Sequence, residues 1–205
     1  SKKFGVDGIA AVKLLIKMKE ISNKIGISFH IGSQCMNPDA YKISINKAVS
    51  IIKKSGISLD YFNIGGGFPS EYSGLTPPKL ENYFNVINTE LSKHCILSRV
   101  KFLSEPGRVL VSNSMSLVVR VDLRKKNNLF INDGIHGHLY TANEFSLLSP
   151  VKIFNDKKKS KLVPFNFYGP TCDSNDFIKG PFFLPDSIKE GDYIELKKMG
   201  AYTVT

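Results

Sequence analysis

The 205-residue sequence has few cysteines, few arginines and no long hydrophobic segment. No window approaches the roughly 18 uninterrupted apolar residues of a membrane span, so we expect no membrane association. No apolar segment follows the basic amino terminus, so no secretory signal is identified. The three cysteines, Cys35, Cys95 and Cys172, are far apart and form no CxxC pair. We therefore expect neither a metal site nor a disulfide framework, and a cytoplasmic location.

The net charge of +10 raises the hypothesis of nucleic-acid binding. However, only four of the 28 cationic residues are Arg, the side chain that base and phosphate readers favour. The lysines are scattered, and the one dense run covers residues 157–159 with Lys161. A solvated lysine-rich surface explains the charge better, and we expect no nucleic-acid partner.

The first half of the sequence alternates between helical and strand patterns. Helical spacing over 8–24, 38–55 and 78–93 alternates with short apolar strands at 27–33, 61–64 and 100–103. Each strand leads into a polar or glycine-bearing segment, as in parallel β/α units, whose ligand sites lie at the carboxyl ends of the strands. Residues 1–110 are therefore predicted to form part of a (β/α)8 TIM-like barrel.

The pattern changes after residue 110. Short strands are predicted at 116–123, 129–132, 163–168 and 192–197, with turns and no long helix between them. We therefore predict an antiparallel β domain, of sandwich or barrel type, over residues 111–205. The expected fold class is α/β plus β.

Two motifs that follow predicted strands suit an anionic ligand. Gly65, Gly66 and Gly67 expose backbone N–H groups that a phosphate can approach, although a triple glycine also occurs in ordinary turns. Glu105 and Arg108 lie three residues apart in Ser-Glu-Pro-Gly-Arg108. There the arginine could bind a phosphate and the carboxylate a ring nitrogen or a cation. The alternative is a surface ion pair at a Pro-Gly turn.

Three further side chains are candidates for chemistry. His30, close to Ser33, is either a core histidine or one that stacks on a ring or transfers protons. Cys172 adjoins Asp173, which suits a proton donor beside a cation-binding carboxylate, although a lone cysteine is more often buried packing. Tyr202 could offer its hydroxyl to an anion or could be an aromatic residue in a strand.

In their order along the chain, six motifs resemble those of the pyridoxal-phosphate-dependent ornithine/diaminopimelate/arginine decarboxylases, an alanine-racemase-like (fold type III) family. The detail is most similar to bacterial ornithine decarboxylases. The motifs are His30-Ile-Gly-Ser33, Asn63-Ile-Gly-Gly-Gly-Phe-Pro69, Ser104-Glu-Pro-Gly-Arg108, Asn132-Asp-Gly134, Tyr168-Gly-Pro-Thr-Cys-Asp173, and Gly191-Asp192 through Met199-Gly-Ala-Tyr202.

The resemblance implies a role for each motif. His30 would stack on the pyridine ring of pyridoxal phosphate, and Glu105 would pair with its nitrogen. The phosphate would be held by Ser33, the glycine backbone at Gly65–Gly67 and Gly107, Arg108 and Tyr202. Cys172 would return a proton to the carbon that loses CO₂, and Asp173 would bind the distal ammonium of an amino-acid substrate. The family acts as a homodimer in which one subunit supplies the Cys172 loop to the other subunit's cofactor.

The sequence departs from the family pattern in three places. The lysine that links the cofactor lies upstream of every motif present here. We therefore expect a fragment that is inactive alone. The other part of the barrel is either encoded on a companion chain or lost. His136 stands where the family has an aromatic residue, and Tyr140-Thr141 replaces a substrate-side Tyr-Asp pair.

The resemblance thus implies decarboxylation of a basic amino acid, with L-ornithine to putrescine in polyamine synthesis as the first choice. Diaminopimelate, lysine and arginine are alternative substrates. A non-catalytic remnant, or a pseudoenzyme that pairs with other decarboxylase chains, is the alternative from another functional class.

Overall fold

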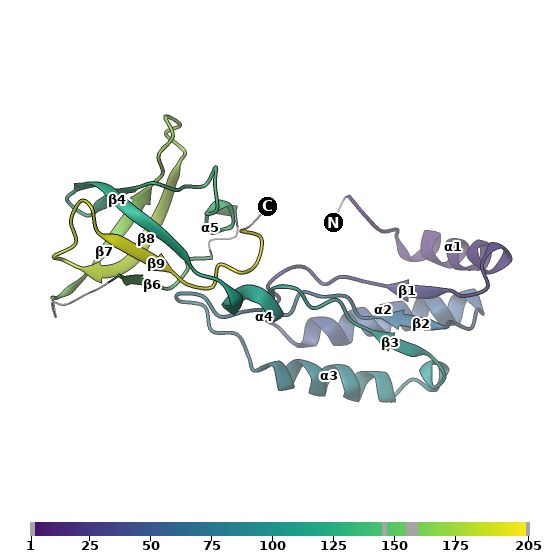
Figure 1. The fold of residues 1–205 in the computed structure, drawn as a ribbon. Helices are drawn as coiled ribbons and strands as arrows, with labels where there is room; N and C mark the ends of the chain where they lie inside the picture. The colour runs from purple at the N-terminus through teal and green to yellow at the C-terminus, as the bar shows by residue number, and fades with distance from the viewer. Residues whose placement is uncertain (1–2, 145–146, 155–159, 204–205) are drawn as a thin grey trace. The chain divides into compact units, whose positions relative to one another are not determined.

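The computed structural model describes residues 3–144, 147–154 and 160–203 (Figure 1). The chain divides into two compact units, each with its own core. The first unit comprises Ser1–Pro69 and Pro77–Gly107, and the second comprises Ser70–Thr76 and Arg108–Thr205. The lysine run at 157–159 lies outside the described residues.

The first unit contains a three-stranded parallel sheet in the order β1-β2-β3. Its strands are β1 (Gly26–Ser28), β2 (Tyr61–Asn63) and β3 (Lys101–Leu103). In the register, Phe62 lies opposite both Ile27 and Phe102. The expected parallel β/α arrangement is therefore confirmed, although β1 ends earlier than predicted, which places His30 in the loop that follows it.

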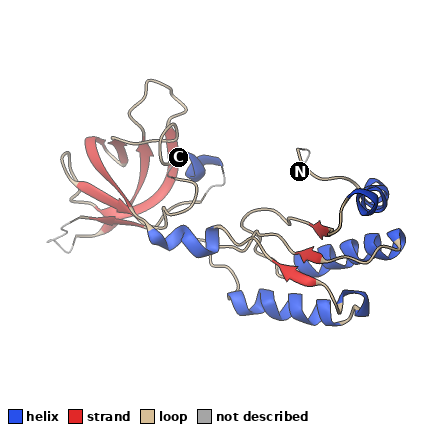
Figure 2. Cartoon of the chain, turned by 45° about the vertical axis from the view of Figure 1, so that its right-hand side comes forward, coloured by secondary structure: helices blue, strands red, loops and turns tan. Residues whose placement is uncertain are grey.

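Helices α1 (Gly8–Ile21), α2 (Asp39–Ser55) and α3 (Leu80–Ser92) alternate with these strands, and a short 3₁₀ turn, η1 (Cys95–Leu97), precedes β3 (Figures 1 and 2). The Asp7 side chain caps α1 by accepting a hydrogen bond from Ala10 N at 2.8 Å. Helix α2 ends at Gly56, whose φ of 68° is the left-handed conformation that glycine adopts without strain. The fully buried side chains Tyr41, Phe62 and Tyr83 come from helices α2 and α3 and from β2, so they join these layers in one core.

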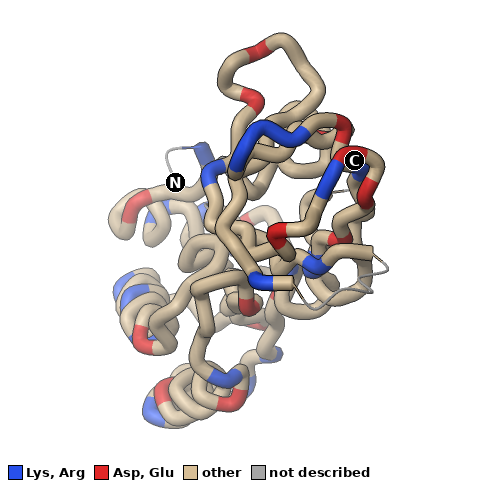
Figure 3. The backbone as a smooth tube through the Cα atoms, turned by 90° about the vertical axis from the view of Figure 1, so that its left-hand side faces the viewer, with Lys and Arg blue, Asp and Glu red and all other residues tan. Residues whose placement is uncertain are grey.

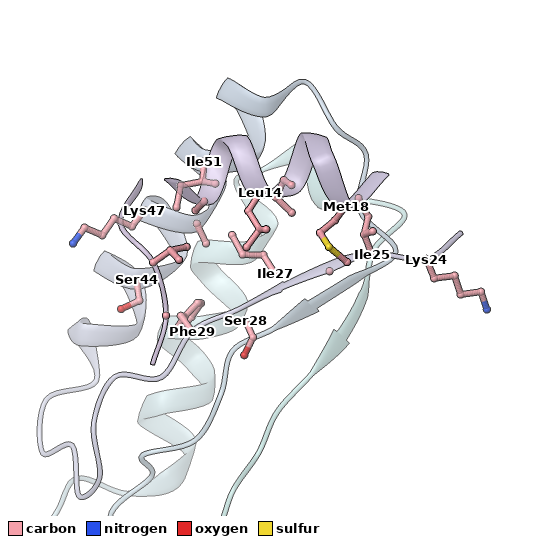
Figure 4. Close-up of a pocket in the computed structure, with 16 residues that line it drawn as sticks. Leu14, Met18, Lys24, Ile25, Ile27, Ser28, Phe29, Ser44, Lys47 and Ile51 are labelled. Atoms are coloured by element: carbon pink, nitrogen blue, oxygen red, sulfur yellow. The ribbon is translucent and has the colours of Figure 1, made fainter. Parts of the chain in front are cut away.

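A cavity of about 550 Å³ lies between α1, β1 and α2 (Figure 4). Its wall is mainly apolar and includes Leu14, Met18, Ile25, Ile27 and Ile51. None of the predicted site residues lines it, although Phe29, in the loop that follows β1, does.

The second unit contains a six-stranded sheet in the order β6-β9-β4-β5-β7-β8. Its strands are β4 (Leu117–Lys125), β5 (Asn128–Ile131), β6 (Val151–Ile153), β7 (Leu162–Tyr168), β8 (Phe177–Pro185) and β9 (Tyr193–Leu196). The edge strands β6 and β8 also pack together, so the sheet curls back on itself. Alternate residues of the strands, including Val121, Leu129, Phe167 and Ile194, form its buried core.

The β domain differs from the sequence expectation in two respects. Strands β5 and β7 pair in parallel, whereas the other strand pairs are antiparallel. The connection between these two strands contains helix α5 (Tyr140–Glu144) and β6, and it is long enough for the crossover that parallel pairing requires. Strands β6 and β8 were not predicted; Gly180 and Pro181 interrupt the strand pattern of β8.

The segment Ser70–Thr76, which the sequence places with the barrel, belongs to the second unit. Ser73 N donates to Leu148 O at 2.9 Å. Ser112, in the short 3₁₀ turn η2 (Ser112–Ser114) that follows helix α4 (Arg108–Val111), donates from Oγ to Ser70 Oγ at 2.9 Å. These long-range bonds attach the segment to the β domain.

Charged residues are distributed through both units. Within the part of the chain that the structure describes, Lys and Arg are interspersed with Asp and Glu (Figure 3). Within the described residues, no helix is long and apolar enough to cross a membrane.

Candidate functional site

The loops after β1, β2 and β3 meet at the carboxyl end of the first unit's sheet. Glu105 N donates to Gly65 O at 2.8 Å, which joins the loops after β3 and β2. Gly66 N donates to His30 Nδ1 at 3.4 Å, which joins the loops after β2 and β1. Three motifs that are far apart in the sequence, those of His30, Gly65–Gly67 and Glu105, are thus brought together.

The triple glycine is required by this close approach. A Cβ on Gly65 would collide with Phe29 O, one on Gly66 with Glu105 O, and one on Gly67 with Gly32 O. Gly65 and Gly67 also have φ values of +67° and +100°, which L-residues rarely adopt. The absence of side chains at these three glycines therefore allows three loops to pack closely together. An ordinary turn would not require it at all three positions.

A buried tyrosine supports the glycine segment. Tyr41, which is fully buried, donates its hydroxyl to Gly66 O at 2.9 Å. Burial raises the pKa of this hydroxyl well above its usual range, so it remains a neutral donor at physiological pH. The tyrosine thereby fixes the Gly66 carbonyl and the peptide plane next to His30.

Glu105 is positioned by an amide. Asn63 Nδ2 donates to Glu105 Oε1 at 2.7 Å, and Asn63 Oδ1 accepts from Gly65 N at 2.8 Å. Within the described residues no Lys, Arg or His forms an ion pair with Glu105, and the residue is exposed. The carboxylate is thus oriented at the end of the sheet with its charge available to a ligand.

His30 and Ser33 are exposed in the loop after β1. The alternative that His30 is a buried core histidine is therefore wrong. Because Gly66 N donates to Nδ1, the neutral ring carries its proton on Nε2. The Gly66 amide thus holds one edge of an imidazole that is otherwise exposed.

In the second unit, Arg108 lies in an aromatic enclosure. The residue is only 4% exposed, and its guanidinium lies 5.7 Å from the ring centre of Tyr72 and 5.0 Å from that of Tyr202. Its NH1 donates to Tyr72 Oη at 2.8 Å. Such burial is incompatible with the alternative of a surface Glu–Arg pair.

The Arg108 charge has no protein counter-ion within the described residues, and Nε is buried without a hydrogen-bond partner there. A buried cation without a carboxylate partner is costly unless an anion completes it. The phosphate of pyridoxal phosphate is such an anion. Arg108 therefore fits the phosphate that the sequence resemblance implies, with the exposed Tyr202 beside it.

A second group of side chains in the same unit contains Cys172 and Asp173, both exposed on the turn between β7 and β8. Asp173 Oδ1 accepts from Asn175 N at 2.9 Å, and Oδ2 lies 2.9 Å from His136 Nε2. The backbone N–H of Asn175 and the bond with His136 lower the pKa of the Asp173 carboxyl. The carboxylate therefore remains charged beside the thiol.

Asp176 holds this turn against the loop that carries His136. Its buried carboxylate accepts from Ile135 N at 2.9 Å and from Thr171 Oγ1 at 2.7 Å. A Cβ on either Gly134 or Gly169 would collide with this carboxylate. The Asn-Asp-Gly134 and Gly169–Asp173 motifs are thus linked by one buried side chain.

The two remaining candidates for substrate binding lie on α5. Tyr140 is 54% exposed, whereas Thr141 is 8% exposed. The largely buried Thr141 has a hydroxyl where the family pattern has a carboxylate. Among the predicted substrate residues, Asp173 alone carries a carboxylate.

Sequence reasoning missed Asn63 and Tyr72 as supporting residues. Asn63 pairs with Leu103, two residues before Glu105, so its contact with Glu105 follows from the strand register, which the sequence does not reveal. The sequence does not reveal the contact of Tyr72 with Arg108 either, because it depends on Ser70–Thr76 folding with the β domain.

Comparisons with known proteins agree with this geometry. The family model described as "Pyridoxal-dependent decarboxylase, pyridoxal binding domain" matches residues 1–112. The chain belongs to this decarboxylase family. The resemblance found in the sequence is thereby confirmed, as are the partial-barrel fold class and pyridoxal phosphate as the family's cofactor.

Curated relatives include the ornithine decarboxylase of Schizosaccharomyces pombe, which is 30% identical over all of this chain and 50% of its own length. Antizyme inhibitor 2 of Xenopus laevis is also 30% identical, over all of this chain and 49% of its own length. The chain thus spans about half the length of these relatives. A solved structure of lysine/ornithine decarboxylase from Vibrio vulnificus with cadaverine has a TM-score of 0.83 and 31% identity, covering 99% of this chain and 57% of the other.

Proposed function

We propose that the full-length parent protein decarboxylates a basic amino acid with the aid of pyridoxal phosphate, and that this chain alone is inactive. The proposed substrate is L-ornithine, with putrescine as the product. The family membership and the relatives named ornithine decarboxylase support this choice. The observation that carries it is the exposed Cys172-Asp173 pair, in which a thiol adjoins a carboxylate that stays charged.

The resemblance implies cofactor-binding residues in each unit. In the second unit, Arg108 and Tyr202 would bind the phosphate. In the first unit, this role would fall to Ser33 and the glycine backbone at Gly65–Gly67 and Gly107. Glu105, which Asn63 orients, would hold the ring nitrogen, and His30 would stack on the ring. When bound, pyridoxal phosphate supplies an electron-accepting ring that stabilises the charge left by the departing carboxylate.

Asp173 recognises the substrate's distal ammonium, and Cys172 delivers a proton to the carbon that loses CO₂. In a homodimer, the turn carrying these two residues serves the cofactor of the other subunit. A carboxylate that remains ionised is a selective partner for a cationic side chain, because a neutral amino acid would leave it unpaired.

The test is CO₂ release from ornithine, lysine, arginine and diaminopimelate by the full-length parent protein loaded with pyridoxal phosphate, because this chain alone is expected to be inactive. We expect the largest kcat/KM with ornithine, and a clear preference for diaminopimelate would refute the assignment. Cys172→Ala should abolish putrescine formation. Cys95→Ala, which changes another exposed cysteine, is the matched control and should leave it unchanged.

A second candidate is a non-catalytic protein that pairs with decarboxylase chains. It is supported by a relative that is not named as a decarboxylase, antizyme inhibitor 2, whose 30% identity to this chain equals that of the fungal decarboxylase. In this case the loaded protein would release no CO₂ from any of the four substrates. Size-exclusion chromatography with an active ornithine decarboxylase would then show a mixed dimer.

A further inference from the structure

We propose that His136 controls cation recognition at Asp173 by competing with the substrate's distal ammonium, so that substrate affinity falls as His136 becomes protonated. The inference rests on the proposed function, because it assigns a specificity device to the same carboxylate. It concerns a histidine that occupies a position where the family pattern has an aromatic residue.

The competition follows from how the two Asp173 oxygens are used. Oδ1 accepts from both the backbone N and the Nδ2 of Asn175, at 2.9 and 3.1 Å. Oδ2 lies 2.9 Å from His136 Nε2. Any ammonium that approaches this carboxylate therefore meets either an oxygen held by two Asn175 donors or the one that faces the imidazole.

Both partners are accessible to a ligand. The His136 side chain is 50% exposed and that of Asp173 is 39% exposed. The pair is consequently not a buried structural contact, and either side chain can change partner without repacking the β-domain core.

The imidazole charge decides how strongly the carboxylate attracts a cation. A neutral His136 donates one hydrogen bond and leaves the full negative charge on Asp173. A protonated His136 neutralises the pair, and an arriving ammonium then meets a positive neighbour. Histidine changes its charge within the range of about pH 5 to 8, whereas an aliphatic ammonium titrates near pH 10.

Other ionisable groups around His136 do not remove this effect. The bonds to Asn175 and His136 lower the pKa of Asp173, so the carboxylate keeps its charge across this pH range. The Cys172 thiol is next to Asp173 in the chain, and the Asp176 carboxylate accepts a hydrogen bond from Ile135 N. On the His136 loop, Asp133 already pairs with His138, with Oδ2 at 2.7 Å from Nδ1.

His138 provides a matched control. It lies on the same loop, is 54% exposed, and makes a histidine–carboxylate pair of similar length with Asp133. Its partner is not part of the proposed substrate site. Replacing it changes the loop charge in the same way without touching Asp173.

The experiment measures kcat and KM for ornithine between pH 5.5 and 8.5 with the full-length loaded protein. We expect the wild-type KM to rise about threefold to tenfold toward low pH, the size expected for one added charge at an exposed site. His136→Gln should remove this rise, His136→Lys should keep KM high throughout, and His138→Gln should behave like wild type. A His136→Gln protein with the wild-type KM profile would overturn the inference.

Equilibrium binding separates this inference from the proposed reaction. NMR titration of the His136 ring should show that its pKa falls when putrescine is added, because linkage is reciprocal. If ornithine is not decarboxylated but putrescine lowers that pKa, the proposed reaction is wrong and the inference stands. If putrescine binds without changing the His136 titration, the inference is wrong.

Discussion

The Asn63 amide donates to Glu105 Oε1 at 2.7 Å across two neighbouring parallel strands. The same unit contains a second hydrogen bond of this kind, in which Asn46 Nδ2 donates to Glu90 Oε1 at 2.7 Å. The first pair lies at the carboxyl end of the sheet, where we propose cofactor binding, and the second joins α2 to α3. The two contacts have the same geometry but different expected roles.

Asn63→Ala should weaken pyridoxal phosphate binding by about tenfold, because the Glu105 carboxylate loses a hydrogen bond worth about 1–2 kcal/mol and its orientation. Fluorescence titration of the full-length protein measures the affinity. Asn46→Ala, the matched control, should lower the melting temperature while retaining wild-type affinity. Equal losses of affinity in both variants would contradict the role of Asn63.

Arg108→Gln should weaken binding of pyridoxal phosphate by about tenfold to a hundredfold, since charge-assisted bonds to a phosphate contribute about 1.5–3 kcal/mol each. Binding of pyridoxal, which lacks the phosphate, should change little. Arg108→Lys should recover part of the affinity and rules out simple misfolding. Arg120→Gln, at an arginine paired with Asp122 on the surface, should match wild type for both ligands. A similar loss for pyridoxal would exclude phosphate as the partner of Arg108.

Asp176→Ala should destabilise the second unit by about 2–4 kcal/mol, because buried donors from Ile135 and Thr171 lose their acceptor. Asp176→Asn retains one acceptor oxygen and should cost less. Urea unfolding followed by tyrosine fluorescence measures the difference, with Asp122→Asn as an exposed control. An unchanged unfolding midpoint in Asp176→Ala would show that the carboxylate does not hold the two loops together.

Because of Glu90, the free energy of unfolding should depend on pH in the acidic range. Bonds from Lys93 and Asn46 lower the pKa of this buried carboxyl. Its stabilising contribution is therefore present above the pKa of the unfolded state and is lost as the pH falls through the lower pKa of the folded state. The free energy of unfolding of wild type should exceed that of Glu90→Gln at pH 7, and the gap should narrow below about pH 4. A gap that stays constant down to pH 3 would argue against an ionised Glu90.

The sequence predicts the first unit well because its signals are local. Glycine and polar motifs directly after apolar strands place His30, Gly65–Gly67 and Glu105 at one sheet edge without knowledge of the contacts. The orienting role of Asn63 depends on strand register. Propensity does not reveal register between parallel strands separated by a helix.

The second unit is less predictable because its decisive contacts are long-range. The parallel β5–β7 pair and strand β6 follow from how the sheet closes, which local patterns do not encode. The pairing of His136 with Asp173 likewise depends on the buried Asp176. Its sequence signal was only an unexpected histidine in a glycine-bearing loop.

Because Ser70–Thr76 folds with the second unit, the two units cannot be expressed separately by cutting the chain once. The polypeptide crosses from one unit to the other three times. A recombinant piece that begins at Arg108 would leave behind Tyr72, the partner of the arginine, and Ser70, the partner of Ser112. Grafting and domain-exchange experiments should therefore carry the seven-residue segment with the β domain.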